Sequence, residues 1–258
     1  MTARTLKLDT PVVDTVTKYS GWQYIYRIGA SAALLVVLAG LVDILIMFMP
    51  GTGTSPGIRT VVDWFTLLQS NGFVALRDMG LLNMLTITCS VGVFFALFGM
   101  HRRISPQAAG LALILVSIGA AIYIANNTAL PMLTLSNQYA AAATEGQKAL
   151  WASAGQALLA QEDLTAGAFP GFFFVEIAGL LVAMVALRGG VFRRWEAWVG
   201  IVGTGCLLFF NICAAFIPVL YDSVMPIFGA GGGLLNLVWY ALIARRLLYR
   251  PLTIAREK

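Results

Sequence analysis

Six apolar stretches constrain what this chain can fold into more than any other feature of its sequence. A hydrocarbon core of about 30 Å needs roughly 20 residues of α-helix to cross it. Lipid offers no partner for backbone N–H and C=O groups, so each stretch must form a helix. The stretches are expected at residues 27–49, 79–100, 107–130, 169–188, 197–218 and 226–244. We therefore predict an all-α fold, an integral membrane six-helix bundle.

Composition and charge placement indicate a single membrane domain. The mean hydropathy is +0.82, and 59% of the residues are hydrophobic against 11% charged, which lies outside the soluble globular range. We predict that residues 1–26 form a cytoplasmic segment, residues 27–244 the six-span domain and residues 245–258 a basic cytoplasmic tail. The first segment has no apolar core, so it does not read as a cleavable signal peptide.

The lysine and arginine residues indicate how the bundle is oriented. If the N-terminus is cytoplasmic, only Arg59, Arg77 and Lys148 of the 17 Lys and Arg residues face outside. Positive charge concentrates on the cytoplasmic side of membrane proteins, so we predict a multi-pass protein of the cell membrane with both termini in the cytoplasm. The net charge of +5 then reflects topology, and membrane lipid rather than nucleic acid is the expected partner.

Two outer connections are expected to be helical rather than plain linkers. Residues 59–73 are amphipathic and contain aromatic residues, and such segments often lie in the headgroup layer. Residues 136–163 are rich in Ala, Gln and Leu, which predicts one or two short helices on the outer mouth of the bundle. Both segments are candidate contacts for a protein partner. The sequence PGTGTSPG at residues 50–57 predicts a turn after the first span.

Most polar residues within the predicted spans lie in their outer halves. Glu176 is about 10 Å below the outer end of the fourth span, and Asp43 is at a similar depth in the first. A carboxylate within the bilayer costs roughly 2.5–3.5 kcal/mol on insertion scales and usually faces the bundle interior or a wet cavity. We predict an outward-facing polar cavity, roofed by residues 136–163, with Arg77 as the cationic partner of Glu176 or Asp43. The predicted ligand-binding residues are Asp43, Arg77, Asn83, Asn127, Glu176 and Asn211.

A structural explanation of the same residues remains open. Asn, Thr and protonated Glu side chains also join helices within membranes, at about 0.6 kcal/mol per contact. For a single asparagine that role is the more common one. The clustering of the residues at one depth favours a site.

Catalytic and metal chemistry have little support in the sequence. The single histidine, His101, lies at a cytoplasmic end, where a solvated position is expected, and it is remote from the polar cluster, so no nucleophile has a histidine base. The three cysteines lack the spacing of a metal site. Residues 192–198, FRRWEAW, are expected to be an interfacial anchor. We predict no catalytic residue, metal or cofactor, which favours a protein that is not an enzyme.

Three functions are compatible with this pattern. The first is binding or transport of a small ligand through the outer polar cavity. The second is a non-catalytic accessory or structural subunit that presents residues 59–73 and 136–163 to a partner. The third is an intramembrane enzyme acting on a lipid, with Asp43 and Glu176 as an acid–base pair.

Several stretches also resemble one protein family. VVDWFTLLQSN followed by LRDMGLLNML, then FRRWEAWVGIVG and LVWYALIARRLL, occur in this order within residues 20–248. They resemble the uncharacterised bacterial membrane proteins grouped as domain of unknown function 4386. The resemblance implies the six-span fold and its topology, and it implies no activity.

Overall fold

The computed structural model describes residues 12–47, 60–162 and 168–254, and these residues form helices joined by short connections. Six helical segments are long and apolar enough to cross a membrane, which confirms the predicted all-α membrane protein. The helices that supply them are α1 (Val12–Met47), α4 (Leu81–His101), α5 (Pro106–Asn126), α8 (Phe169–Gly189), α9 (Arg194–Phe216) and α11 (Gly232–Ile254). The turn predicted at residues 50–57 lies outside the described residues.

The helices extend beyond the apolar stretches at both ends of the chain. Helix α1 begins at Val12, within the segment predicted to precede the first span, and α11 continues to Ile254, within the predicted tail. The physical reason is that backbone hydrogen bonding continues into water, whereas hydropathy reports only the length that lies in lipid. A short helix, α10 (Tyr221–Val224), and a π-helical segment, Met225–Gly231, connect α9 to α11.

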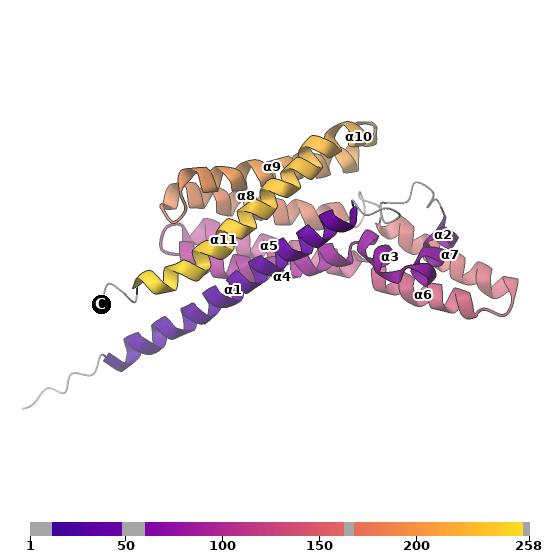
Figure 1. Ribbon diagram of the computed structural model, residues 1–258, viewed down its shortest axis with the longest axis horizontal. Coiled ribbons are helices and arrows are strands. Elements are labelled where there is room, and N and C mark those ends of the chain that lie inside the picture. The colour runs from indigo at the N-terminus through magenta and orange to yellow at the C-terminus, as the bar shows by residue number, and fades with distance from the viewer. Residues whose placement is uncertain (1–11, 48–59, 163–167, 255–258) are drawn as a thin grey trace, which may run out of the picture.

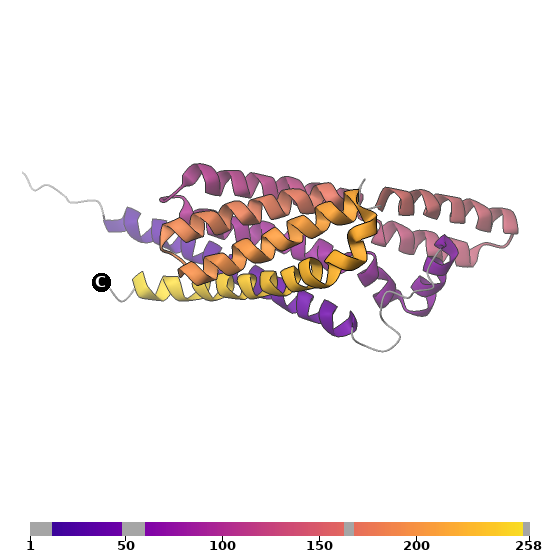
Figure 2. The same ribbon diagram turned by 90° about the horizontal axis from the view of Figure 1, so that it is seen from above.

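The six long helices form a closed ring in chain order. Each packs on its neighbours in sequence, from α1 on α4 through to α9 on α11, and α11 packs back on α1. Figures 1 and 2 show these helices running along one direction. Small residues set the close approaches: a Cβ on Gly119 of α5 would lie 2.6 Å from the carbonyl oxygen of Gly171 of α8. Such small-residue contacts are typical of membrane helix packing.

Four shorter helices form a separate module, which we name the cap. They are α2 (Val61–Ser70), α3 (Gly72–Asp78), α6 (Ala129–Ala141) and α7 (Glu145–Glu162). Val61, Phe65 and Leu68 of α2 are buried in a hydrophobic cluster that also contains Met132 of α6. The apolar face of the amphipathic segment therefore packs on protein.

The cap stands beyond one end of the ring. Helix α6 follows α5 after a break at residues 127–128, and α7 returns toward α8. Residues 136–163 were expected to roof the ring, but the α6–α7 hairpin extends away from it, in line with α5 and α8 (Figures 1 and 2). We call this the cap end. The opposite end is named the arginine end for Arg102, Arg103, Arg188, Arg193, Arg194, Arg245 and Arg246.

Candidate functional site

A buried hydrogen bond joins the neighbouring helices α8 and α9. Asn211 Nδ2 donates to Glu176 Oε1 at 2.6 Å, and it also lies 3.1 Å from the Leu207 carbonyl oxygen of its own helix. Glu176 is 5% exposed and Asn211 is buried as well. The two residues lie at matching depths because α8 and α9 are consecutive antiparallel helices.

The second oxygen of Glu176 has no such partner. Oε2 is buried and accepts no hydrogen bond from the described residues. No lysine or arginine among the described residues forms an ion pair with Glu176. Arg77, one of its predicted partners, pairs with Asp43 and Asp78 instead. A buried polar atom left unpaired costs about 1–3 kcal/mol, and more when it is charged. The Glu176 carboxyl group therefore uses only part of its hydrogen-bonding capacity within the described residues.

A cavity of about 30 Å³ lies beside Glu176, inside the ring. Phe94, Leu97 and Trp239 form part of its apolar wall. A water molecule needs about 10–15 Å³ of such space, so the cavity suits one or two waters. Drug-sized ligands occupy pockets of about 300–1,000 Å³. The cavity is therefore sized for a very small solute.

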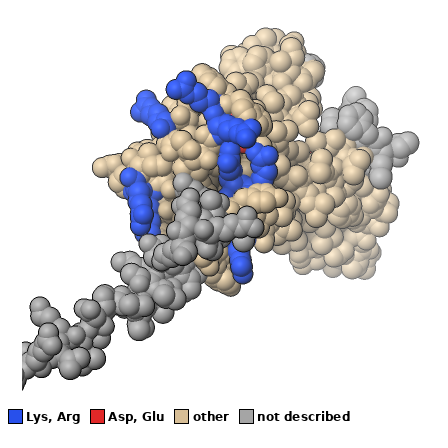
Figure 3. All heavy atoms as spheres, turned by 60° about the vertical axis from the view of Figure 1, so that its left-hand side comes forward, with Lys and Arg blue, Asp and Glu red and all other residues tan. Residues whose placement is uncertain are grey.

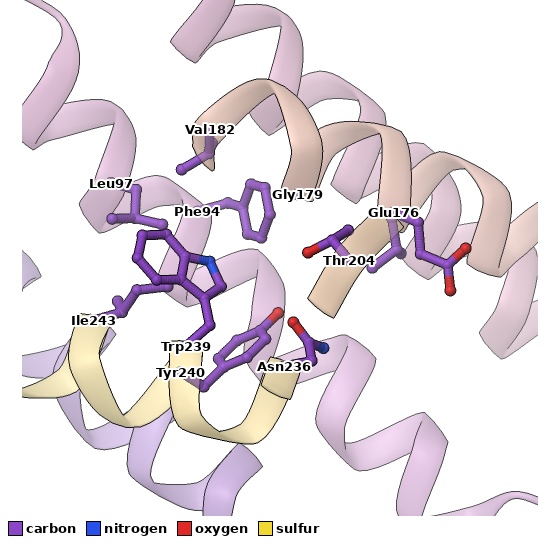
Figure 4. Close-up of a pocket in the computed structure, with 11 residues that line it drawn as sticks. Phe94, Leu97, Glu176, Gly179, Val182, Thr204, Asn236, Trp239, Tyr240 and Ile243 are labelled. Atoms are coloured by element: carbon purple, nitrogen blue, oxygen red, sulfur yellow. The ribbon is translucent and has the colours of Figure 1, made fainter. Parts of the chain in front are cut away.

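Three further polar groups line this cavity. Thr204 comes from α9, and Asn236 and Tyr240 come from successive turns of α11. Figure 4 shows their polar atoms directed toward the same space, while the Glu176 carboxylate points away from it in that view. Tyr240 Oη lies 2.8 Å from Ser90 Oγ on α4, and this hydrogen bond orients the phenol. Helices α8, α9 and α11 thus each contribute a polar residue to the lining, and Ser90 of α4 bonds to one of them.

Asp43 and Arg77 form a second, separate cluster at the cap end. Arg77 Nε donates to Asp43 Oδ1 at 2.7 Å, and Arg77 Nη1 donates to Asp78 Oδ1 at 2.6 Å. Arg77 Nη2 also donates to the Asp43 carbonyl oxygen at 3.0 Å. Burial raises the pKa of Asp78 above its ordinary value, although the Arg77 guanidinium opposes that shift. The cluster ties the end of α1 to the junction of α3 and α4.

The two remaining predicted residues lie elsewhere. Asn83 is exposed on the surface of α4. Asn127 Nδ2 donates to the Met79 carbonyl oxygen at 3.0 Å, and its Oδ1 accepts from the Ala129 N–H at 3.3 Å, so it links the junction of α3 and α4 to the start of α6. Gly80 follows with a φ of +79°, where a side chain would collide with the Tyr123 hydroxyl. The structure pairs Asp43 with Arg77 and Glu176 with Asn211, and among the six predicted residues Glu176 lines the cavity.

Three polar residues of the cavity were not among the residues predicted from the sequence: Thr204, Asn236 and Tyr240. Tyr240 follows Asn236 by four residues, a spacing that puts both on one helix face, and this was the available signal. Thr204 follows Gly203, whose missing side chain lets α11 approach: a Cβ there would lie 2.9 Å from the Asn236 backbone nitrogen.

Glu196 forms a third cluster, which was also missed because its segment resembled an interfacial anchor. Its side chain is 0% exposed. Oε1 accepts from Arg245 Nη2 at 2.6 Å, and Oε2 accepts from Arg246 Nη2 and the Arg193 N–H, each at 2.8 Å. The carboxylate joins the start of α9 to α11. Sequence alone gave no reason to pair residues about fifty positions apart.

The expected solvated position of His101 is wrong. His101 is buried, its Nδ1 donates to the Leu97 carbonyl oxygen at 2.9 Å, and its ring stacks on Phe192 at 6.0 Å. The connection between α8 and α9 covers the end of α4, which hydropathy does not report. Within the described residues, no group of three or more His, Cys, Asp or Glu side chains could hold a metal ion.

Comparison with known proteins adds one finding. A family model described as "Domain of unknown function (DUF4386)" matches residues 69–244, well over half of the chain. No curated protein and no solved structure matches the chain.

Proposed function

The chain belongs to the DUF4386 family, and from that premise we propose that it binds and transports a small polar solute through the middle of its six-helix ring. One observation carries the proposal: Glu176 lines a water-sized cavity, and one oxygen of its buried carboxyl group accepts no hydrogen bond from the described residues. Thr204, Asn236 and Tyr240 are the other polar residues of the cavity, and they would contact a solute bound there. The protein is a polytopic membrane protein, and ionisable residues within membrane spans commonly mark solute pathways.

Energetics favour a binding role for Glu176 over a purely adhesive one. Joining α8 to α9 needs only an amide pair, and polar contacts between membrane helices contribute about 0.6 kcal/mol each. A carboxylate in that position costs roughly 2.5–3.5 kcal/mol on insertion scales. When the group is ionised, that cost exceeds what the single hydrogen bond to Asn211 returns. A burial cost that the protein's own contacts do not offset is consistent with a side chain that binds a solute.

The cavity limits what that solute is in the conformation described. A proton, water or a comparably small polar molecule fits about 30 Å³, whereas a larger substrate requires the helices to separate. The π-helical segment Met225–Gly231 leads directly into the helix that carries Asn236 and Tyr240. Such segments frequently occur at functional sites.

Flux measurements on reconstituted vesicles test this proposal. The full chain is placed in liposomes, and two probes are followed: relaxation of a proton gradient, with a trapped pH-sensitive dye, and osmotic swelling in glycerol, by light scattering. We expect flux of at least one probe, and at least a tenfold loss of that flux in Glu176→Gln. Glu145→Gln is the matched control, because Glu145 is exposed in the cap. Absence of flux for both probes, or equal flux in Glu176→Gln, contradicts the proposal.

The proposal includes the cell membrane as the location and the cytoplasm as the side of both termini. The gathering of arginines at one end supports this orientation. Intact cells expressing Leu150→Cys, in the cap, should react with a membrane-impermeant thiol reagent, and Arg103→Cys should not. The reverse labelling pattern would invert the orientation.

A second candidate function, an accessory subunit, is favoured by the cap. The cap has its own hydrophobic cluster, and α7 exposes Leu150 to solvent. On this alternative, Leu150→Lys abolishes co-purification of a partner while Glu176→Gln leaves it unchanged. The third function, a lipid-modifying enzyme, has less support, since Asp43 is paired with Arg77 and does not line the cavity.

A further inference from the structure

We propose that the arginine end binds the phosphate of an anionic phospholipid, at a site formed by Arg245 and Arg246 of α11 with Arg194 of α9. This inference is independent of the solute pathway. It starts from the buried carboxylate that holds two of these side chains in place.

Glu196 fixes the positions of both α11 guanidiniums. Arg245 Nη2 lies 2.6 Å from Oε1, and Arg246 donates to Oε2 through Nη2 at 2.8 Å and through Nε at 3.2 Å. Two long side chains that are mobile in most proteins are therefore ordered before any ligand arrives. A site ordered in advance binds with a smaller entropic penalty.

Most of the donors on these two arginines remain available. Each guanidinium carries five N–H donors; Glu196 accepts one bond from Arg245 and two from Arg246, and no other described residue accepts from either. The Arg245 side chain is 49% exposed and the Arg246 side chain 31% exposed. A planar fork of donors matches the geometry of phosphate oxygens.

The surrounding surface is positively charged. Arginine side chains gather on this end of the molecule (Figure 3), and the exposed ones include Arg103, Arg188 and Arg194. Among the side chains that the structure describes here, Glu196 is the only acidic one, and it neutralises only one of its two partners. An anion approaching this face therefore meets a net positive field.

Two tryptophans indicate that the ligand is a lipid rather than a soluble phosphate. Trp195 and Trp198 are exposed and belong to the same turns of α9 as Glu196. Tryptophan side chains concentrate at the level of lipid headgroups. The guanidiniums therefore lie at the depth of the phosphate layer, within reach of a phospholipid in the adjoining leaflet.

Lipid binding by the full chain in neutral detergent tests this site. Dioleoyl phosphatidylglycerol and dioleoyl phosphatidylcholine are titrated separately, and bound lipid is counted by native mass spectrometry. We expect at least tenfold tighter binding of phosphatidylglycerol. Arg245→Lys should weaken that binding at least fivefold, because it keeps the charge but loses the fork. Equal binding of the two lipids overturns the proposal.

Charge-matched variants separate a built site from a diffuse field. Arg103→Gln removes an exposed arginine from the same end, and Lys148→Gln removes a charge from the cap; each should change binding less than twofold. A loss in Arg103→Gln as large as that in Arg245→Lys overturns the site. A melting temperature of Arg245→Lys in phosphatidylcholine equal to wild type excludes misfolding. Arg194→Gln removes no side-chain hydrogen bond or ion pair with the described residues, and it should also weaken binding. Displacement of the lipid by millimolar inorganic phosphate would overturn its assignment to a phospholipid.

Discussion

Glu176 and Glu196 are both buried glutamates on spanning helices, yet their surroundings differ. Glu196 receives hydrogen bonds from two arginines and a backbone N–H, so its charge is compensated and each oxygen has a partner. Glu176 receives one hydrogen bond, from a neutral asparagine, and its second oxygen has none from the described residues. Two glutamates that are equally buried therefore differ in the number and charge of their hydrogen-bond partners.

The largest expected effect is at the compensated site. Glu196→Gln leaves two arginines facing each other without their counter-charge, and we expect a loss of about 2–3 kcal/mol in the free energy of unfolding. The value is below the 3–5 kcal/mol typical of breaking a fully buried pair, because both guanidiniums reach solvent. Unfolding in mixed micelles measures it, with Glu145→Gln as the exposed control. A loss below about 1 kcal/mol would show that the ion pairs of Glu196 contribute little to the stability of the fold.

A smaller loss is expected when the single donor to Glu176 is removed. Asn211→Leu leaves the carboxyl group buried without any hydrogen bond, which should cost about 1–2 kcal/mol. Replacing both partners, in Glu176→Leu with Asn211→Leu, should cost less than Asn211→Leu alone, because no unpaired polar group remains. If the double variant is less stable than Asn211→Leu alone, the pair of polar side chains serves mainly to hold α8 and α9 together.

The stability change in Glu176→Gln should be smaller still. Glutamine accepts the same hydrogen bond from Asn211 and nearly matches the carboxyl group in size, so the free energy of unfolding should stay within about 1 kcal/mol of wild type. The same substitution should reduce flux at least tenfold. A destabilisation equal to that of Glu196→Gln would erase the contrast between the two carboxylates.

The smallest effect concerns Asp78, a third buried carboxyl, outside the spans. Its pKa is raised by burial, so the folded state holds its proton to a higher pH than the unfolded state does. Its contribution to stability is therefore greatest below the ordinary pKa of 3.8 and is lost as pH rises through the raised value. Asp78→Asn should flatten this part of the stability profile, measured by unfolding between pH 3.5 and about 7. An unchanged profile in the variant would assign the pH dependence to another group.

The sequence was sufficient for the spans and for the choice of partners open to Arg77, because both depend on depth. Glu176 and Asn211 were both among the predicted binding residues, and the hydrogen bond between them was not predicted. Arg77 was expected to pair with Asp43 or Glu176, and it binds Asp43. Depth follows from counting residues along a span.

The direction in which a residue faces does not follow from depth. Asn83 has the predicted depth but lies on the exposed side of α4, because a helix turns by about 100° per residue and its rotation depends on its neighbours. The rotation of α9 and α11 likewise decides that Thr204 and Tyr240 face the cavity. Glu196 was missed because its arginines belong to a helix far along the chain, and charges at helix ends are usually explained by topology alone.

The closure of the ring has a consequence for how the protein is made. Helix α1 packs on both α4 and α11, so one flank of the first span stays without its protein neighbour until the sixth has entered the membrane. A Cβ on Gly40 of α1 would lie 2.5 Å from a methyl group of Leu237, so this last seam is closely fitted. The first five helices therefore form an open arc whose free flanks contact lipid or the insertion machinery, and the closed ring exists only after the final span has been inserted.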